Sequence, residues 1–306
     1  MGELLRRYGI GLTALFIGLT AFWLLVLVIL PNLTMFESSF RPYLPMVDIG
    51  GPLDTYSLNN YLRILDAPDP VTWFGITFDV PLRVQIFGQT IFYSAVVTII
   101  TFLLAYPIAY YLAKIALPRS LPTLFLLLFI PLWVSEILRA FAWWIILTYN
   151  GPLNALLVGL NILDKPARML GYGSVIVGLV YTYVLFMVFP LYNAISSLDS
   201  NQIEAAEDLG SPWWRTHWRV ILPHAKPGIA SGSVMVFMLC AGSILVPTIL
   251  GGTTVQWFTQ TVQTWILEAL DWNSGAAFAF ILLILCTVFV FGMMRIFRVN
   301  LTDIAK

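Results

Sequence analysis

The chain has 306 residues, of which 59% are hydrophobic and 10% are charged. Soluble domains are about 45–50% apolar and about 25% charged, so this composition excludes an ordinary soluble protein. The 16 basic residues are balanced by 16 acidic ones, whereas a nucleic-acid-binding surface needs a clustered basic excess. The composition therefore predicts a protein of the lipid bilayer with no nucleic-acid partner.

Six stretches of the sequence are long and apolar enough to cross a bilayer, which takes about 20 residues of helix. Backbone groups in hydrocarbon must bond internally, and the alternating ten-residue pattern of barrel strands is missing, so each stretch is predicted to be a helix. We expect an all-α membrane protein with six transmembrane helices and a single transmembrane domain over residues 1–306. The stretches cover residues 9–31, 87–115, 121–147, 173–195, 226–250 and 275–297.

The first span lies within residues 1–31, follows Arg6 and Arg7, and resembles a secretory signal peptide. Its apolar run is too long for the hydrophobic region of such a signal, and no small-residue cleavage site follows. We therefore expect an uncleaved first helix. Residues 32–86 come next and are rich in proline, aspartate and aromatic residues, which favours an ordered cap over a bare linker. The five remaining helices are expected within residues 87–297.

The basic residues predict the orientation, since loops on the cytoplasmic side of a membrane carry an excess of lysine and arginine. An even number of spans places both termini on one side. That side would hold Arg6, Arg7, Lys114, Arg119, Arg215, Arg219, Lys226, Arg295, Arg298 and Lys306, against Arg41, Arg63, Arg83, Lys165 and Arg168 on the other. Both termini, including the tail 298–306, are therefore predicted to be cytoplasmic, and residues 32–86 external.

The third span carries Glu136 and Arg139, and ionisable residues inside a membrane are costly and often functional. Their i, i+3 spacing allows them to pair with each other, and this structural role stays open beside a role on a transport path. In the second role Glu136 would meet a cationic solute, and nearby aromatic faces would attract ammonium groups. The candidate path residues are Trp133, Ser135, Glu136, Arg139, Trp143, Pro247, Glu268 and Asp271.

Some of these candidates have plainer explanations. Tryptophans are also typical of the aromatic belt at a membrane interface. Glu268 and Asp271, near the outer end of the sixth span, form either an acidic vestibule or a solvated loop. Pro247, with Gly251 and Gly252, is predicted to break the fifth span near a cavity, because proline removes a helical hydrogen bond.

The sequence offers no motif for a metal or a cofactor. Cys240 and Cys286 lie in apolar stretches without a CxxC spacing, and we expect both to be buried hydrophobic residues. His217 and His224 are seven residues apart without neighbouring ligands, and we expect them at the surface. The phosphate-binding pattern G-x-x-x-x-G-K-[ST] is missing, so no nucleotide site is predicted on this chain, and it is not expected to be an enzyme by itself.

A polar stretch, EAAEDLGSPWWRTHWRVILP at residues 204–223, interrupts the apolar sequence inside the loop 196–224. Its acids, Glu204, Glu207 and Asp208, share one face of a predicted helix. A second helix has an apolar stripe of Trp214, Trp218, Ile221 and Leu222 with arginines beside it. An amphipathic loop lying on the membrane is one interpretation, but acids beside anionic headgroups favour a protein partner instead.

Local signals predict how this stretch folds. Asn201, followed by Glu204, indicates a capping box that opens the first helix. Gly210 is placed for the left-handed residue that ends it. Ser211 and Pro212 predict the start of the second helix, and Pro223 is expected to stop it. The result would be two short helices joined by a sharp turn.

The stretch resembles the EAA loop of ABC-importer permeases, whose pattern is E-A-A, three residues, G, nine residues, I-x-L-P. Val220 stands where the family usually has isoleucine. In that family the loop is the coupling helix, which sits in a groove of a cytoplasmic ATPase. The residues that this resemblance assigns to coupling, together with neighbouring charges, are Glu204, Ala205, Ala206, Glu207, Asp208, Gly210, Arg215, Leu222 and Pro223.

Other segments, among them residues 130–157, 189–199 and 246–252, look like type I permeases of the spermidine/putrescine branch. The resemblance implies two cytoplasmic ATPase subunits that bind ATP and magnesium, a second and usually unlike permease subunit, and an external substrate-binding protein. It also implies a bacterial inner-membrane location and polyamine import by alternating access.

Other readings stay open. The coupling loop is shared with permeases for sulfate, iron and amino-acid-like solutes. An ion-coupled secondary transporter would show inverted repeats, of which we find no sign in the sequence. A membrane-embedded enzyme would need clustered histidines or acids, and this chain has two scattered histidines.

Overall fold

The computed structural model describes residues 2–45, 48, 50–66, 68–73 and 76–298, and for residues 2–8 and 68–79 only the backbone. The described chain is mostly helical and forms two compact units. One unit comprises Met1–Pro81 and Val262–Ile281, and the other Leu82–Thr261 and Leu282–Lys306. The long C-terminal helix α15 (Trp272–Phe297) contributes to both.

Five described helical stretches are long and apolar enough to cross a membrane, which confirms a multi-pass helical protein. Two further apolar helices, Leu121–Trp133 and Lys226–Ala241, are shorter than a full crossing. They lie where the third and fifth spans were expected, so these two predicted spans are broken helices. The five long stretches are Gly9–Ser39, Leu82–Ile115, Glu136–Gly159, Tyr172–Ser196 and Trp272–Phe297.

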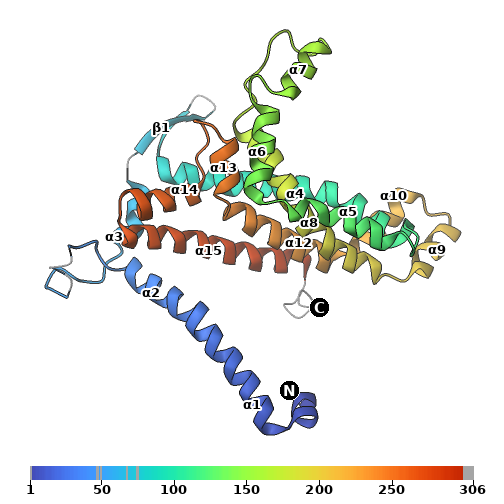
Figure 1. The fold of residues 1–306 in the computed structure, drawn as a ribbon, viewed down its shortest axis with the longest axis horizontal. Helices are drawn as coiled ribbons and strands as arrows, with labels where there is room; N and C mark the ends of the chain where they lie inside the picture. The colour runs from blue at the N-terminus through green and yellow to red at the C-terminus, as the bar shows by residue number, and fades with distance from the viewer. Residues whose placement is uncertain (1, 46–47, 49, 67, 74–75, 299–306) are drawn as a thin grey trace. The chain divides into compact units, whose positions relative to one another are not determined.

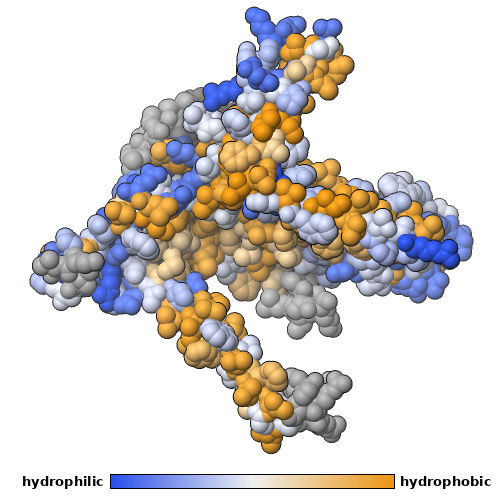
Figure 2. Space-filling model, in the orientation of Figure 1, coloured by the Kyte–Doolittle hydropathy of each residue, from blue (hydrophilic) through white to orange (hydrophobic). Residues whose placement is uncertain are grey.

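The first unit begins with a long apolar helical run, which continues past the predicted end at residue 31 to Ser39. Its large apolar side chains are largely exposed, from Ile10 to Phe36 (Figure 2). Exposed apolar surface on this scale is expected of a helix that contacts lipid or another membrane helix. The run consists of α1 (Gly2–Leu24), the π-helical turn η1 (Leu25–Ile29) and α2 (Leu30–Ser39).

The same unit contains a two-stranded antiparallel sheet, so the all-α prediction was wrong in this detail. Strands β1 (Pro68–Trp73) and β2 (Ile76–Pro81) pair from Pro68↔Pro81 to Trp73↔Ile76. The sequence does not indicate these strands, because proline and aspartate, which are uncommon in strands, occur in both of them. The remaining elements of the unit are α3 (Asn59–Leu62), the 3-10 turn η2 (Arg63–Leu65) and the π-helical turn η5 (Thr264–Glu268).

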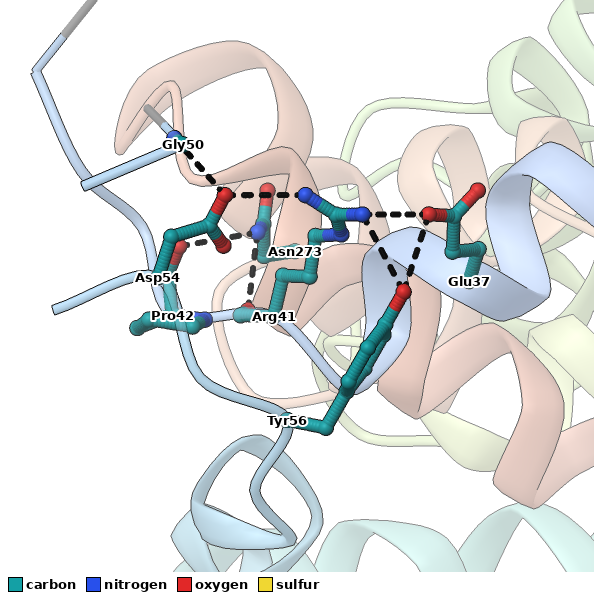
Figure 3. A network of polar contacts seen from close by, with 7 residues as sticks. All are labelled: Glu37, Arg41, Pro42, Gly50, Asp54, Tyr56 and Asn273. Carbon is teal, nitrogen blue, oxygen red and sulfur yellow. Dashed lines mark hydrogen bonds and ion pairs between the residues drawn. The ribbon is translucent and has the colours of Figure 1, made fainter. Parts of the chain in front are cut away.

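Polar contacts around Arg41 fix the chain after α2 (Figure 3). Its guanidinium donates to Glu37 at 2.6 Å, to Asp54 at 2.8 Å and to the hydroxyl of Tyr56 at 3.1 Å. Asn273 of α15 donates to the carbonyl of Arg41 at 2.8 Å. These bonds give this part of residues 32–86 a defined structure, as expected of an ordered segment.

The second unit is a helical bundle in which α8 (Tyr172–Ser196) packs against α4 (Leu82–Tyr110) and α12 (Lys226–Ala241) (Figure 1). A Cβ at Gly228 of α12 would lie 2.5 Å from the carbonyl oxygen of Pro190 in α8, so only glycine permits this approach. Small residues bring membrane helices together in this way. The other bundle helices are η3 (Tyr111–Ile115), α5 (Leu121–Trp133), α6 (Glu136–Leu147), α7 (Pro152–Gly159), α13 (Leu245–Leu250) and α14 (Phe258–Gln263), which runs into the first unit.

The fifth predicted span breaks at residues 242–244, ahead of Pro247 rather than at it. Pro247 lies in the first turn of α13, where the missing N–H has no helical partner to lose. Side chains from the following segment satisfy the carbonyls that the break frees. Trp257 donates to the carbonyl of Cys240 at 3.0 Å, and Thr259 to that of Ser243 at 2.6 Å.

Candidate functional site

The polar loop between α8 and α12 opens with helix α9 (Ser200–Asp208). Its N-cap is Asp199, whose side chain accepts a hydrogen bond from the backbone N–H of Asn201 at 3.0 Å. The predicted capping box of Asn201 and Glu204 was therefore wrong, because Asn201 already lies inside the helix. The helix does form where the sequence predicts one.

The turn after α9 has the conformation predicted for Gly210, whose φ is +75°. The Gly210 N–H donates to the carbonyl of Glu207 at 2.8 Å, and the Ser211 N–H donates to that of Ala206 at 3.0 Å. This pair of bonds is the Schellman motif, in which a left-handed residue lets the chain reverse and satisfies the last carbonyls of a helix. The turn is thus a defined connection between the two helices.

The second helix of the loop differs from the prediction at both ends. It begins at Trp213 with Pro212 as its N-cap, one residue later than expected. Pro223 does not stop it, because helical structure continues to His224. A π-helical turn precedes this proline, and such turns are common where a helix accommodates strain. The parts are α10 (Trp213–Thr216), η4 (His217–Ile221) and α11 (Leu222–His224).

The outer surface of the loop combines acids with large apolar side chains. Glu204, Glu207 and Asp208 are exposed, while Leu209 is 88% exposed and Trp213 is 71% exposed. The predicted apolar stripe is divided: Trp214 and Trp218 face outward, whereas Ile221 is buried in the bundle. Arg215 lies over the Trp214 ring at 5.4 Å. Acids and large apolar side chains side by side suit a protein partner better than an anionic membrane surface.

Two polar contacts fasten the ends of the loop. The Lys114 ammonium group at the end of η3 donates to the carbonyl of Leu198, directly before α9. The Ser197 hydroxyl and Nε2 of His224 lie 3.1 Å apart and join the beginning of the loop to its end. Ile203, Val220 and Leu222 pack against the apolar core of the bundle. The loop is therefore attached to the spans at several points.

His217 is buried, with 6% of its surface exposed, so its predicted surface position was wrong. Its Nδ1 lies 2.6 Å from the hydroxyl of Tyr106 in α4, and the rings of Tyr110 and Trp213 lie 4.6 and 4.3 Å from its own. Burial lowers the pKa of His217, because desolvation disfavours the charged imidazole. The ring is therefore neutral at pH 7.

Glu136 begins α6, directly after the break at Val134 and Ser135. The structure shows no ion pair between Glu136 and Arg139; instead the Tyr183 hydroxyl donates to the Glu136 carboxylate at 3.3 Å. The Nε of Arg139 is buried without a hydrogen-bond partner in the part of the chain that the structure describes. The i, i+3 spacing of the two residues therefore does not lead to an ion pair between them in this structure.

The remaining path candidates in this unit are dispersed. Trp133 is 75% exposed and Ser135 is exposed, whereas Pro247 is buried. Trp143 is half-buried and packs edge-on against Tyr181, with ring centroids 5.7 Å apart. Among these candidates only Trp143 is tied to the bundle by a ring contact.

The two acidic candidates in the first unit differ from each other. Glu268 is exposed, but the Asp271 side chain is only 7% exposed and pairs with Arg63 at 2.6 Å. Asp271 also accepts hydrogen bonds from the backbone and the hydroxyl of Ser274 at the start of α15. Its carboxylate is engaged in fixing the fold.

Sequence reasoning missed Tyr183, Tyr106 and the role of Lys114. Each of the two tyrosines lies in an apolar span and has a polar tip that needs a partner when buried, which was the available signal. As predicted, Cys240 and Cys286 are buried and unpaired. Within the described residues no group of three or more histidines, cysteines or acids is placed to hold a metal ion.

Helices long and apolar enough to cross a membrane, two broken predicted spans and a polar loop fastened to the bundle together characterise a multi-pass membrane protein. Residues 115–301, more than half of the chain, match the family described as "Binding-protein-dependent transport system inner membrane component", and the chain belongs to this family of ABC-importer permeases. Membership confirms the resemblance seen in the sequence. It also makes the chain a transport subunit, with ATP hydrolysis on separate ATPase subunits.

Among its relatives are proteins named "Spermidine/putrescine transport system permease protein PotB". The one from Escherichia coli (strain K12) is 34% identical over 257 residues, covering 83% of this chain and 86% of the relative. The one from Haemophilus influenzae is 32% identical over 274 residues, covering 89% and 90%. The similarity thus extends over most of both proteins.

The fold is similar to that of solved transporters. A chain in the crystal structure of a bacterial alginate ABC transporter, in complex with alginate pentasaccharide-bound periplasmic protein, matches 98% of this chain and 99% of its own length with a TM-score of 0.73. A chain of the MetNI methionine ABC transporter matches 70% of this chain and 93% of its own, with a TM-score of 0.52. At 16% and 19% identity these likenesses concern the fold alone.

Proposed function

We propose that this chain is a permease subunit of an ATP-driven importer for polyamines such as spermidine or putrescine. The observation that carries the proposal is the similarity to spermidine/putrescine permeases, 34% identity over 83% of the chain. A substrate-binding protein would deliver the polyamine from outside. ATP-driven closure of the partner ATPases would turn the path outward to receive it. ATP and the delivered polyamine would thus shift the same equilibrium between inward-facing and outward-facing states.

The surroundings of Glu136 support a cationic solute. This carboxylate is half-buried at a helix break, and a tyrosine hydroxyl is its only described hydrogen-bond partner. A carboxylate at that depth is favourable when a positive charge offsets it. An ammonium group of a polyamine supplies that charge, and Trp143 with Tyr181 offers aromatic faces near the path. Trp133, Ser135, Arg139, Pro247 and Glu268 remain proposed path residues, whereas the Asp271 carboxylate is engaged by Arg63 and Ser274.

We further propose six membrane crossings with both termini in the cytoplasm. Helix α12 has 16 residues and is about 24 Å long, which is short of the roughly 30 Å hydrocarbon core. Together with α13 it completes one crossing, and α5 with α6 completes another. The basic residues then favour a cytoplasmic side that carries the termini and the loop 196–224. The location would be the bacterial inner membrane, and residues 1–306 would act as one permease domain.

The loop 196–224, called the coupling loop from here on, would seat on an ATPase subunit. Its exposed acids, with Glu204 foremost, would pair with basic groups of that subunit, and Leu209 and Trp213 would fill apolar pockets. Ala205, Ala206, Leu222 and Pro223 shape the helices, and Arg215 adds a charge at the rim. Two ATPases holding ATP and magnesium, a second permease subunit and an external binding protein would complete the importer.

An assembled complex tests the substrate. Purified permease pair, ATPases and binding protein in liposomes should hydrolyse ATP faster with spermidine or putrescine than with sulfate or an amino acid. Stimulation by sulfate or an iron complex alone would contradict the polyamine assignment and leave the importer intact. Uptake that follows an ion gradient without any ATPase would contradict the importer itself.

The orientation has its own test. A single cysteine placed at Glu204, in a chain with Cys240 and Cys286 replaced by alanine, should react with a membrane-impermeant maleimide only in inside-out vesicles. A cysteine at Lys165 should react only from the opposite side. Labelling of position 204 from outside would contradict the proposed topology.

A further inference from the structure

One buried polar contact joins the second helix of the coupling loop to α4. Nδ1 of His217 and the hydroxyl of Tyr106 are 2.6 Å apart, and His217 is 94% shielded from solvent by its surroundings. The rings of Tyr110 and Trp213 enclose the imidazole at 4.6 and 4.3 Å. The contact therefore links the loop to α4, which is helical from Leu82 to Tyr110 and contains Pro107 directly after Tyr106.

Packing alone does not explain a histidine at this position. Nε2 of His217 is buried and has no hydrogen-bond partner among the described residues. A buried polar atom without a partner is unfavourable, so a phenylalanine would fill the same aromatic enclosure at lower cost. What the imidazole adds is its second nitrogen, Nδ1, which holds Tyr106. This points to a role in which the hydrogen bond itself matters.

We propose that His217 is a positioning residue that transmits the movement of the coupling loop to α4 through its hydrogen bond with Tyr106. The inference rests on the proposed function, because it requires the loop to be displaced by an ATPase. It adds to that function one specific contact, the hydrogen bond between His217 and Tyr106. His217 touches neither the solute nor ATP.

Hydrogen bonds within the rest of the loop hold it together, so that a displacement of the loop reaches the contact between His217 and Tyr106. The Schellman turn at Gly210 sets the angle between the two helices, and the Thr216 hydroxyl donates to that of Ser211 at 3.3 Å. The bond between Ser197 and His224 closes the loop. The loop can therefore move as one body, and its force must leave through its contacts with the bundle.

These contacts differ in the direction of the force that they can transmit. Apolar contacts are not directional, and because packed side chains resist compression more than separation, they transmit a push better than a pull. A hydrogen bond has a narrow range of distance and angle and resists displacement in both directions. The bond between His217 and Tyr106 can accordingly pull α4 as well as push it. Because Tyr106 lies before Pro107 and α4 is helical from Leu82 onward, the displacement acts on the long part of the helix, which reaches the depth of the membrane.

The test compares uptake with ATP hydrolysis in the full importer reconstituted in liposomes. His217→Phe keeps the ring and removes the hydrogen bond, and Tyr106→Phe removes the same bond from the other side. We expect both variants to retain their ATPase subunits, to hydrolyse ATP within about twofold of wild type, and to import about three- to tenfold less solute per ATP. That factor corresponds to the net strength of one hydrogen bond.

Three comparisons separate transmission from plain structure. Tyr111→Phe makes the same change at an exposed position near the end of the same helical run, and should leave the ratio of uptake to hydrolysis unchanged. His217→Asn retains a polar group near Nδ1 and should recover part of the ratio that His217→Phe loses. The double variant of Tyr106 and His217 should be no worse than the poorer single variant, since both remove one bond.

Several outcomes would overturn the inference. They are a wild-type ratio in Tyr106→Phe, a double variant whose losses multiply, or loss of the ATPases from the complex in His217→Phe. If His217→Phe does not fold, the ratio in Tyr106→Phe decides alone. Failure of the proposed function looks different, because then the wild-type chain itself retains no ATPase.

Discussion

Nη1 of Arg63 lies 2.6 Å from Oδ2 of Asp271, which joins two residues 208 positions apart in the sequence. The Arg63 guanidinium also lies over the ring of Trp265, 5.5 Å from its centroid. The Asp271 carboxylate is almost fully buried and at the same time accepts bonds from Ser274 at the start of α15. The pair therefore connects the segment after α3 to the N-terminus of the C-terminal helix.

Replacing Asp271 by asparagine should destabilise the protein. The change removes a buried charge that offsets Arg63 and one hydrogen bond to Ser274, and we expect a loss of roughly 1–3 kcal/mol in the free energy of unfolding. Thermal unfolding of the detergent-purified chain measures this. Glu268→Gln, an exposed acid three residues away, should change stability by less than about 0.5 kcal/mol. Equal effects of the two variants would contradict a structural role for Asp271.

Substitutions at Gly210 test the effect of its backbone conformation without a steric clash. A Cβ at this position would meet no atom within 4 Å, so only the positive φ of 75° resists substitution. Gly210→Val should strain the turn by about 1–2 kcal/mol or more and loosen the coupling loop, whereas Gly210→Asn should be tolerated better, because asparagine adopts this conformation more readily. Co-purification of the ATPase subunits is the measurement. Retention of ATPase by both variants would show that the turn is dispensable.

Glu136→Gln tests the proposed path. Removing the carboxylate charge should weaken transport of a dicationic or polycationic solute about tenfold or more, seen as a higher KM in liposome uptake. Glu136→Asp keeps the charge and should restore part of the activity. Tyr183→Phe, which removes the hydroxyl that donates to Glu136, should have a smaller effect of the same kind. Wild-type uptake in Glu136→Gln would remove this residue from the path.

The buried His217 predicts a pH dependence of stability. Burial lowers its pKa below the ordinary 6.5, so the unfolded chain binds the proton more tightly. The corresponding stability is fully present above about pH 6.5 and is lost as the pH falls through the lowered pKa. The unfolding temperature should therefore fall more steeply below that pH in wild type than in His217→Phe.

The neighbours of His217 permit this comparison. Tyr106 and Tyr110 of α4 and Trp213 of α10 face the ring, and Glu207 of α9 acts electrostatically on Tyr110. The acids of the loop are the same in both proteins, so their contribution cancels in the difference. Parallel pH profiles for wild type and His217→Phe would show that the ring does not titrate in this range.

The two candidate caps of α9 give a direct comparison of sequence and structure. Asp199→Ala removes the side chain that accepts from the backbone of Asn201 and should cost about 0.5–2 kcal/mol of stability. Asn201→Ala removes the residue that the capping-box pattern indicates, and should cost less. Thermal unfolding of the two variants side by side measures the difference. A larger loss in Asn201→Ala would mean that the pattern, rather than the observed cap, is right.

The sequence by itself determined the membrane class, the positions of most apolar helices and the turn at Gly210, while the family was indicated by the resemblance of residues 204–223 to the EAA pattern. The first three depend on the number of consecutive apolar residues and on turn residues such as Gly210, whose conformational freedom is a property of the residue alone. Charges at helical spacing between apolar stretches are visible without a fold, so the sequence also located the polar loop, and its proposed coupling role comes from the resemblance. The helix boundaries were predicted less well, because Pro247 and Pro223, which were expected to end helices, both lie inside helices.

Only the tertiary structure decided which polar groups meet. Glu136 and Arg139 are spaced to pair along one helix, but the hydroxyl of Tyr183 on another helix reaches Glu136 instead. Asp271 would be an exposed acid by its sequence, and Arg63 converts it into a buried ion pair. His217 has no ligand companions nearby in the sequence, and Tyr106, 111 positions away, supplies its partner. Partners that far apart are chosen by the packing of the helices, which no local pattern encodes.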